Sequence, residues 1–338
     1  MDKMHHRVGV ILCRQTSLGS WGLVLDAFRM ANLLGTRHVF ELTRVSQDGL
    51  AVGHPDGTLS VDRGLDALTE MDAVLIPSLW LNGPQAVAEQ GDLIQALRHL
   101  APSVLVATLC TGAYLLAASG RLDGRVATTH WMLADGFQTR FPRVQLHAEQ
   151  NLTHQDGVVC SGGSLAAVDV CLFVIQLLAG RSVARQTARL LVTDLHRGPQ
   201  TLYTPPQGWR RHQDEDIHRL EAFIAQHHAQ ALSLQQLADQ IHTSVRTLQR
   251  RFQTATGMSP IQYQQAIRVD KAKERLEESS DPVGLVAEKV GYLDRVAFGR
   301  LFKKVTGLTP AAYRQQHAWG HSSPDRPPST GRHVAPER

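Results

Sequence analysis

Cys110 is the residue whose type and position could carry out covalent chemistry. It follows an apolar run, residues 104–109, that is typical of a buried strand, and Thr111-Gly112 lead into a helix-like stretch. A cysteine at such a strand-to-helix turn is placed like the nucleophile of many hydrolases, and a helix N-terminus favours the thiolate. Cys110 is therefore a nucleophile or covalent sensor or, in the simpler interpretation, a small buried residue of a ligand-binding loop.

A cysteine nucleophile needs a base, and the sequence places none beside Cys110. Thr111 follows it, and the loop after the first expected strand, residues 14–22, contains no acid. His130 is the only nearby candidate, and its ordinary role would be to cap the following helix or to line a pocket. We expect no enzyme activity, and we name Cys110 and His130 as the catalytic pair if that expectation fails.

Two segments that lie fifty residues apart share their landmarks in register. Residues 250–263 and 300–313 each carry Arg, Phe, Thr-Gly, an apolar residue, Ser/Thr-Pro and Tyr in the same order. Repetition at a fixed offset indicates one supersecondary unit used twice. The surrounding pattern is a short helix, a turn and a second helix, so we expect two helix-turn-helix units in an all-helical region.

The second helix of each unit shows one apolar and one basic face. In the first unit Ser244 can cap a helix over residues 245–255, whose Val245, Leu248 and Phe252 form a buried face. In the second unit Asp294 takes the place of Ser244. Residues 244–254 contain no acid, as a helix facing DNA phosphates requires. The predicted DNA-contacting residues are Ser244, Arg246, Thr247, Gln249, Arg250, Arg295, Val296, Ala297, Arg300 and Lys303.

Residues 214–318 resemble the DNA-binding domain of AraC/XylS-type transcription regulators. The resemblance is carried by residues 244–252, 256–260, 268–272, 291–292 and 297–310. It implies two helix-turn-helix units joined by a long helix, with the second helix of each unit in consecutive major grooves. Val296-Ala297 leaves the second of these faces poor in hydrogen-bonding groups, which suggests apolar contacts to thymine methyls or weaker recognition there.

The first 195 residues alternate strand-like and helix-like patterns, which predicts a mainly parallel sheet with helices on both faces. The expected strands are residues 8–12, 41–46, 73–77, 104–109 and 158–160, and the expected helices are 22–34, 85–100, 112–119 and 164–178.

Residues 8–195 resemble the PfpI-like, class I amidotransferase-type domain of GlxA-type regulators in the AraC family. Residues 110–118, 122–125, 127–131 and 161–164, together with Asp169, carry the match. The resemblance implies an α/β flavodoxin-like fold. Enzymes of this fold commonly place a His directly after the Cys, or use a distant His and Glu, and the sequence shows neither pattern clearly. It therefore implies an effector-sensing and dimerisation domain.

Ligands of open parallel sheets bind at the carboxyl ends of the strands. Trp21, Trp80 and Trp131 fall near those ends, and aromatic walls suit a cation. Related regulators sense amino acids and small quaternary amines, which the resemblance makes the expected effector class. The predicted effector-binding residues are Ser17, Trp21, Ser78, Trp80, Cys110, Thr111, Gly112, His130, Gly162 and Gly163.

Composition limits the remaining possibilities. The chain has 338 residues, and 43% of them are hydrophobic, which excludes a disordered chain. Its net charge of +4 is too weak alone to indicate a nucleic-acid partner. No apolar run is long enough for a membrane span. Four cysteines without a CxxC spacing predict a reducing cytoplasm, with neither a disulfide framework nor a zinc site. We expect no metal and no cofactor. The expected segments are a sensing domain 1–195, a linker 196–213, a DNA-binding domain 214–318 and a disordered tail 319–338.

The sequence thus predicts a cytoplasmic, homodimeric activator of a catabolic operon. Its expected partners are double-stranded promoter or operator DNA, a small-molecule effector and RNA polymerase, with no membrane. One alternative is a Cys110-dependent amidase or glyoxalase-like enzyme fused to a DNA-binding module. Another is a DNA-binding protein whose sheet domain only dimerises, and a sealed ligand pocket would favour it.

Overall fold

The computed structural model describes residues 4–194, 200 and 212–317. The chain divides into two compact units, Met1–Thr204 and Pro205–Arg338, and each is considered by itself. The expected tail, 319–338, lies outside the described residues. So does the expected linker, 196–213, apart from Gln200, His212 and Gln213.

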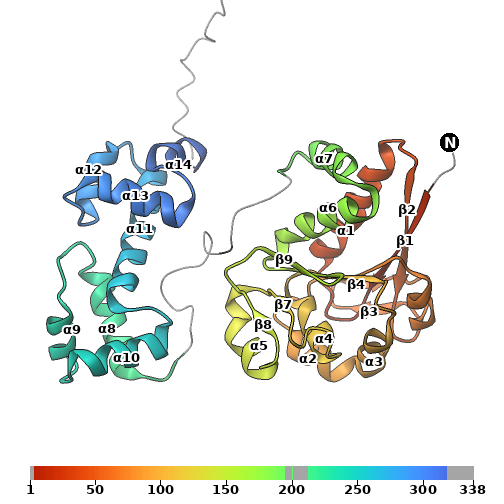
Figure 1. Cartoon of the computed structure of the whole chain (residues 1–338), viewed down its shortest axis with the longest axis horizontal. Coiled ribbons are helices and arrows are strands. Elements are labelled where there is room, and N and C mark those ends of the chain that lie inside the picture. The colour runs from red at the N-terminus through yellow and green to blue at the C-terminus, as the bar shows by residue number, and fades with distance from the viewer. Residues whose placement is uncertain (1–3, 195–199, 201–211, 318–338) are drawn as a thin grey trace, which may run out of the picture. The chain divides into compact units, whose positions relative to one another are not determined.

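The first unit is built on a six-stranded sheet in the order β2-β1-β5-β6-β10-β9 (Figure 1). All neighbouring strands are parallel except the edge pair β10–β9, which is antiparallel. A mainly parallel sheet is therefore confirmed. The strands are β1 (Met4–Ile11), β2 (His38–Val45), β5 (Ala73–Ile76), β6 (Leu105–Thr108), β9 (Leu152–Gln155) and β10 (Val158–Ser161).

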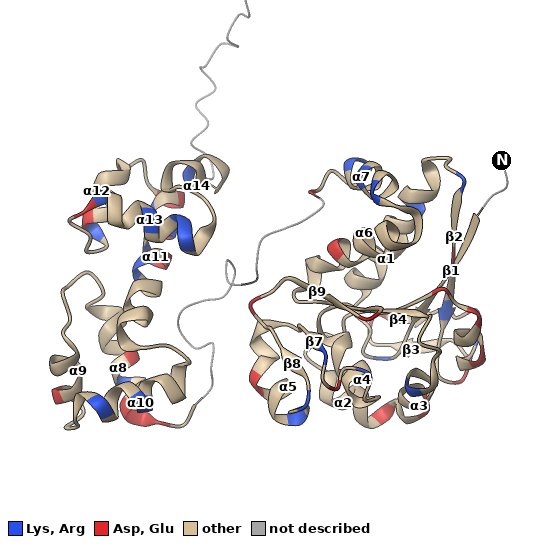
Figure 2. Ribbon diagram, viewed as in Figure 1, with Lys and Arg blue, Asp and Glu red and all other residues tan. Residues whose placement is uncertain are grey.

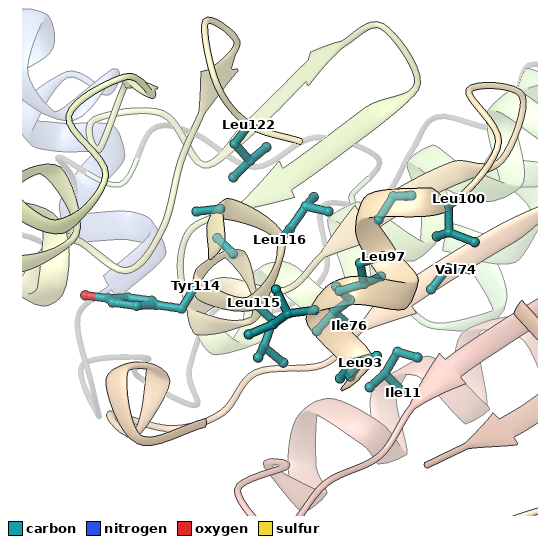
Figure 3. Close-up of a cluster of buried hydrophobic side chains, with 14 of the residues drawn as sticks. Ile11, Val74, Ile76, Leu93, Leu97, Leu100, Tyr114, Leu115, Leu116 and Leu122 are labelled. Atoms are coloured by element: carbon teal, nitrogen blue, oxygen red, sulfur yellow. The ribbon is translucent and has the colours of Figure 1, made fainter. Parts of the chain in front are cut away.

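Helices cover both faces of this sheet because its central strands are apolar on both sides (Figure 1). In β5, Val74 and Ile76 belong to one buried cluster, whereas Ala73 and Leu75 belong to the other. The first cluster, shown in Figure 3, includes residues of α2 (Gly83–Glu89), α3 (Gly91–His99), α4 (Ala113–Ala118) and α5 (Ala134–Arg140). The second includes residues of α1 (Leu18–Leu33), α6 (Ala167–Ala179) and α7 (Arg181–Leu190).

Several expected boundaries were wrong. The single helix expected over residues 85–100 is two helices, because the backbone leaves the helical region at Gln90, with φ −110° and ψ 49°. Two helices, α5 and α7, and the edge strand β9 were missed because they are short and rich in polar residues. Two small ribbons were missed as well: β3 (Val52–His54) with β4 (Gly57–Leu59), and β7 (Val126–Ala127) with β8 (Gln145–Leu146).

The described part of the second unit is helical and repeats itself, as expected. The two helix-turn-helix units are α9–α10 and α12–α13, and α11 joins them (Figure 1). Two separate apolar clusters form their cores. The helices are α8 (Glu215–Gln226), α9 (Leu234–Gln240), α10 (Val245–Thr256), α11 (Pro260–Glu278), α12 (Val283–Lys289), α13 (Arg295–Thr306) and α14 (Pro310–His317).

The repeated Thr-Gly pair ends α10 and α13 in the same way. Gly257 and Gly307 take the left-handed conformation, with φ of +75° and +77°. The hydroxyls of Thr256 and Thr306 each donate to a carbonyl of the preceding turn at 2.8 Å and accept from a main-chain N–H two residues later at 3.2 Å. The sequence repeat is therefore a repeat of structure.

Arg268 of α11 fastens the two helix-turn-helix units to one another. Its guanidinium donates to the carbonyls of His228 at 2.6 Å and Gln230 at 2.8 Å, on the loop after α8, and of Gly291 at 3.1 Å, in the second turn. The Arg268 Cζ also lies 5.1 Å from the centre of the Tyr292 ring. A Cβ on Gly291 would lie 2.2 Å from the carbonyl oxygen of Ala229, so only glycine permits this approach.

Gly112 permits a similar close approach in the first unit. It lies in the turn between β6 and α4, and a Cβ there would lie 2.4 Å from the carbonyl oxygen of Ile76 and 2.7 Å from that of Pro77. The turn after β6 is thus in contact with the end of β5.

We expect Gly112→Ala to lower the free energy of unfolding by about 1–3 kcal/mol, because the new methyl group must displace main-chain atoms. Urea unfolding of the full chain measures this change. Gly163→Ala is the matched control, since nothing lies within 4 Å of a Cβ at that position. Equal stability of the two variants would show that the turn relaxes without cost.

Candidate functional sites

The first candidate site is the exposed face of α10. Ser244 caps the helix, as expected, because its hydroxyl accepts from the Thr247 N–H at 3.2 Å. Arg246, Gln249 and Arg250 are exposed, and Thr247 is half-buried. No acid lies within α10, so the local field favours an anion (Figure 2).

The corresponding face of α13 is less polar. Asp294 caps the helix by accepting from the N–H groups of Val296 at 2.8 Å and Ala297 at 3.2 Å. Val296 is 64% exposed, and Leu293, which sequence reasoning missed, is 97% exposed just before the cap. Arg300 and Lys303 are exposed, whereas Ala297 is half-buried.

Arg295 differs from the other exposed cations of α13 because its side chain lies against α12. A Cβ on Gly284 would lie 2.5 Å from the Arg295 Cζ, so the guanidinium occupies the space that the missing side chain leaves. The structure therefore joins Arg295 to the first helix of its own unit.

Arg251, the neighbour of Arg250, faces the protein and was missed. It donates from Nε to one carboxylate oxygen of Asp214 at 3.0 Å and from Nη2 to the other at 2.6 Å, and Nη2 also donates to Asp216 at 2.8 Å. These bonds hold the pKa of both carboxyl groups below the usual range. The contact offsets part of the negative charge of two acids beside α10. It lines an open cleft of about 660 Å³ that Arg250 also borders.

The structure brings two histidines and a glutamate together at the start of α8, where no metal site was expected. His212 Nε2 and His218 Nδ1 lie 3.1 and 3.2 Å from the same oxygen of Glu221. The two imidazole rings are stacked, with centres 3.9 Å apart and planes 16° apart. In-plane lone pairs of nearly parallel rings do not converge on one ion, so this geometry suits hydrogen bonds to the carboxylate better than metal ligation.

The second candidate site is the turn after β6, where several predicted effector residues meet. Cys110 has φ +55°, so the sharp turn is confirmed. Thr111 Oγ1 lies 3.2 Å from Ser78 Oγ and accepts from the Leu79 N–H at 2.7 Å. Ser17, the cap of α1, donates its main-chain N–H to the Ser78 carbonyl at 2.7 Å. The ends of β1, β5 and β6 are thereby joined.

The surroundings of Cys110 oppose the thiolate that a helix N-terminus would favour. The residue is only 2% exposed. Burial raises the pKa of the thiol, and hydrogen bonds to Ser78 and to Thr111 oppose that shift only in part. Loss of solvation outweighs the favourable field of the turn and disfavours the thiolate. A protonated thiol is a poor nucleophile.

His130 caps a short turn, Trp131–Leu133, and this is the ordinary role considered above. Its Nδ1 accepts from the Met132 N–H at 3.2 Å, and burial lowers the pKa of the ring. The neighbouring Thr129 donates its hydroxyl to the Cys110 carbonyl at 3.1 Å.

The remaining predicted effector residues have different surroundings. Trp21 packs against the apolar cluster under α1, Trp80 is exposed at a turn with φ +54°, and Trp131 makes a tilted contact with His130. Gly162 is buried, and Gly163 is half-buried at the start of a helical turn. Trp21 and Trp131 thus contact different neighbours, and Trp80 is exposed.

A mainly parallel sheet and a double helix-turn-helix with two capped basic helices define a DNA-binding transcription regulator. Residues 237–316 match a family model described as a helix-turn-helix domain. The chain is similar to AraC-type regulators, and its first unit has a PfpI-like α/β fold. Among the described residues, none of the helices combines the length and apolar composition needed to cross a bilayer.

Two full-length relatives are similar over both units. The HTH-type transcriptional regulator GbdR of Pseudomonas aeruginosa is 25% identical over 315 residues, which are 93% of this chain and 85% of GbdR. The HTH-type transcriptional regulator GlxA of Rhizobium meliloti is 25% identical over 326 residues, 92% of this chain and 96% of GlxA. A crystal structure of a transcriptional regulator protein from Vibrio parahaemolyticus has the fold of the first unit, with TM-score 0.51, 18% identity, and coverage of 56% of this chain and all of that one.

We expect Cys110 in the folded chain to react with iodoacetamide at pH 7 at least tenfold more slowly than a free cysteine, because its thiol is buried and protonated. Mass spectrometry after timed quenching measures the rate, and the urea-unfolded chain is the control that should react normally. A rate higher than that of free cysteine would contradict this prediction and would indicate that Cys110 is a thiolate.

Proposed function

We propose that α10 and α13 recognise the operator and that the first unit controls this binding in response to a small metabolite. The observation that carries the proposal is that two capped helices with outward cations are fixed to one frame by Arg268. A helix of this kind can enter a major groove and contact base edges there.

The two helices would contribute differently to recognition. Arg246, Gln249 and Arg250 supply hydrogen-bond donors from α10, and a bidentate arginine–guanine pair is the commonest specific contact. On α13, Val296 and the neighbouring Leu293 offer apolar surface to thymine methyl groups, while Arg300 and Lys303 suit phosphates. We infer that α10 recognises its part of the DNA site by hydrogen bonds, and that α13 recognises the other part by contacts with thymine methyl groups.

The effector would bind at the carboxyl edge of the sheet, near Ser78, Trp80 and His130. Because Cys110 is buried and this burial raises the pKa of its thiol, we infer that it shapes this edge without reacting. The resemblance to regulators that sense amino acids and small quaternary amines supports a metabolite of that class. An activator of a catabolic operon that dimerises through the first unit and contacts RNA polymerase agrees with the same resemblance, as does a cytoplasmic location.

We expect Arg250→Ala to weaken binding to specific DNA by about 1–3 kcal/mol while binding to random DNA changes little. The assay uses a duplex that the wild-type chain selects from a random library, with both affinities measured at one salt concentration. Arg219→Ala, which removes an exposed arginine of α8, is the control. Unchanged affinity of Arg250→Ala for the selected duplex would contradict the assignment of α10.

We expect Cys110→Ser to bind the selected duplex and to keep its effector response, because a serine without an activating base preserves size and polarity but not nucleophilicity. A reporter behind that duplex, assayed with a panel of amino acids and quaternary amines at equal protein levels, measures the response. Complete loss of the response, with folding and DNA binding intact, would favour the Cys110-dependent enzyme.

A further inference from the structure

Gln200, which falls within the expected linker 196–213, belongs to the first unit and is buried there. The residue is 3% exposed. Its main-chain N–H donates to the Glu149 carbonyl at 2.9 Å, which places it beside the loop that leads into β9. A long polar side chain that is buried to this degree must be held by specific partners.

The partners are four oxygen atoms that surround the side-chain nitrogen. Gln200 Nε2 lies 3.2 Å from Thr128 Oγ1, 2.9 Å from the Thr129 carbonyl, 3.1 Å from the Ala148 carbonyl and 3.0 Å from the Gln150 carbonyl. We call these four oxygens the acceptor cage. A carboxamide NH₂ has two hydrogens, so the cage offers more acceptors than one amide group can use.

Gly162 makes the space for this amide. A Cβ on Gly162 would lie 2.0 Å from both Cδ and Nε2 of Gln200, so no other residue would fit there with Gln200 in place. The cage also adjoins the turn that holds Cys110, because Thr129 contributes its carbonyl to the cage and its hydroxyl to the Cys110 carbonyl. The amide therefore lies at the edge of the sheet where the effector is expected.

We propose that the acceptor cage is a binding site for an N–H donor group and that Gln200 is its internal occupant, a latch that holds the interdomain segment on the first unit. The cage would take a carboxamide or a primary ammonium group. It would reject a carboxylate or a quaternary amine, which have no hydrogen to donate. The proposal deepens the proposed function, on which it rests, by naming the group that competes with the latch.

The chain that follows Gln200 is held again at Asp214, where the first described helix of the second unit begins. Asp214 caps α8 and, through both carboxylate oxygens, binds Arg251 of α10. Residues 201–213 thus separate the latch in the first unit from an ion pair on the helix that we assign to DNA recognition. Release of Gln200 would remove the first unit's hold on the chain that leads to Asp214, which is a physical route from the cage to the second unit.

The test uses Gln200→Glu in the full chain. The carboxylate would face four acceptors, so the latch should open, and trypsin should cleave after Arg197, Arg210 or Arg211 at least fivefold faster. Affinity for the selected duplex should change at least threefold. Gln145→Ala, which removes an exposed glutamine with one carbonyl partner, is the matched control and should change neither quantity.

Gln200→Ala leaves the cage empty, and small probes then test its chemistry. Propionamide, which reproduces the lost side chain, should slow tryptic cleavage of this variant toward the wild-type rate, whereas tetramethylammonium should not. Rescue by tetramethylammonium alone would overturn the donor site.

Cleavage and duplex affinity at wild-type values in both Gln200 variants would overturn the latch, even if thermal stability fell, because a merely structural contact would change stability alone. Cleavage is measured without DNA, so it tests the latch even if the assignment of α10 to DNA recognition fails.

Discussion

The proposed use of two helices on one DNA duplex depends on the contact that Arg268 makes across the two helix-turn-helix units. One guanidinium binds carbonyls from the loop after α8 and from the turn before α13, and Gly291 allows the two segments to meet. Consecutive major grooves are separated by a fixed helical turn of about 34 Å. A pair of units without such a link would have to lose orientational freedom on binding DNA, which would weaken affinity.

Close approach of two segments at a glycine also determines the structure at the edge of the sheet. Gly112 brings the turn after β6 against β5, and Gly162 leaves room for Gln200. The resulting edge buries Cys110, and this burial raises the pKa of its thiol. A closed edge favours recognition of shape and polarity over covalent chemistry. It is compatible both with ligand sensing and with a first unit that chiefly dimerises. Of these two interpretations, the acceptor cage favours ligand sensing, because it is a polar site and its occupant, Gln200, lies far along the chain from the residues of the cage.

Local signals in the sequence predicted much of this structure. The caps at Ser244 and Asp294, the alternation of strands and helices and the repeated Thr-Gly ends depend on neighbouring residues, so they could be recognised from spacing. The state of the Cys110 thiol could not, because desolvation comes from distant segments and here exceeds the local effect of the turn. Arg251 and Gln200 were missed for the same reason: each is held by partners far away in the sequence, and no periodic pattern marks them.

The strength of the latch determines whether it can regulate. The amide of Gln200 can give two hydrogens to the cage, and its main-chain N–H adds a third bond, each contributing about 0.5–1.5 kcal/mol net. The sum is about 3 kcal/mol, which corresponds to a change of roughly a hundredfold in an equilibrium. A ligand that supplies an equivalent donor can offset this free energy, whereas one that binds both states equally shifts nothing. A latch of this size is strong enough to hold the segment without effector and weak enough for a metabolite to open.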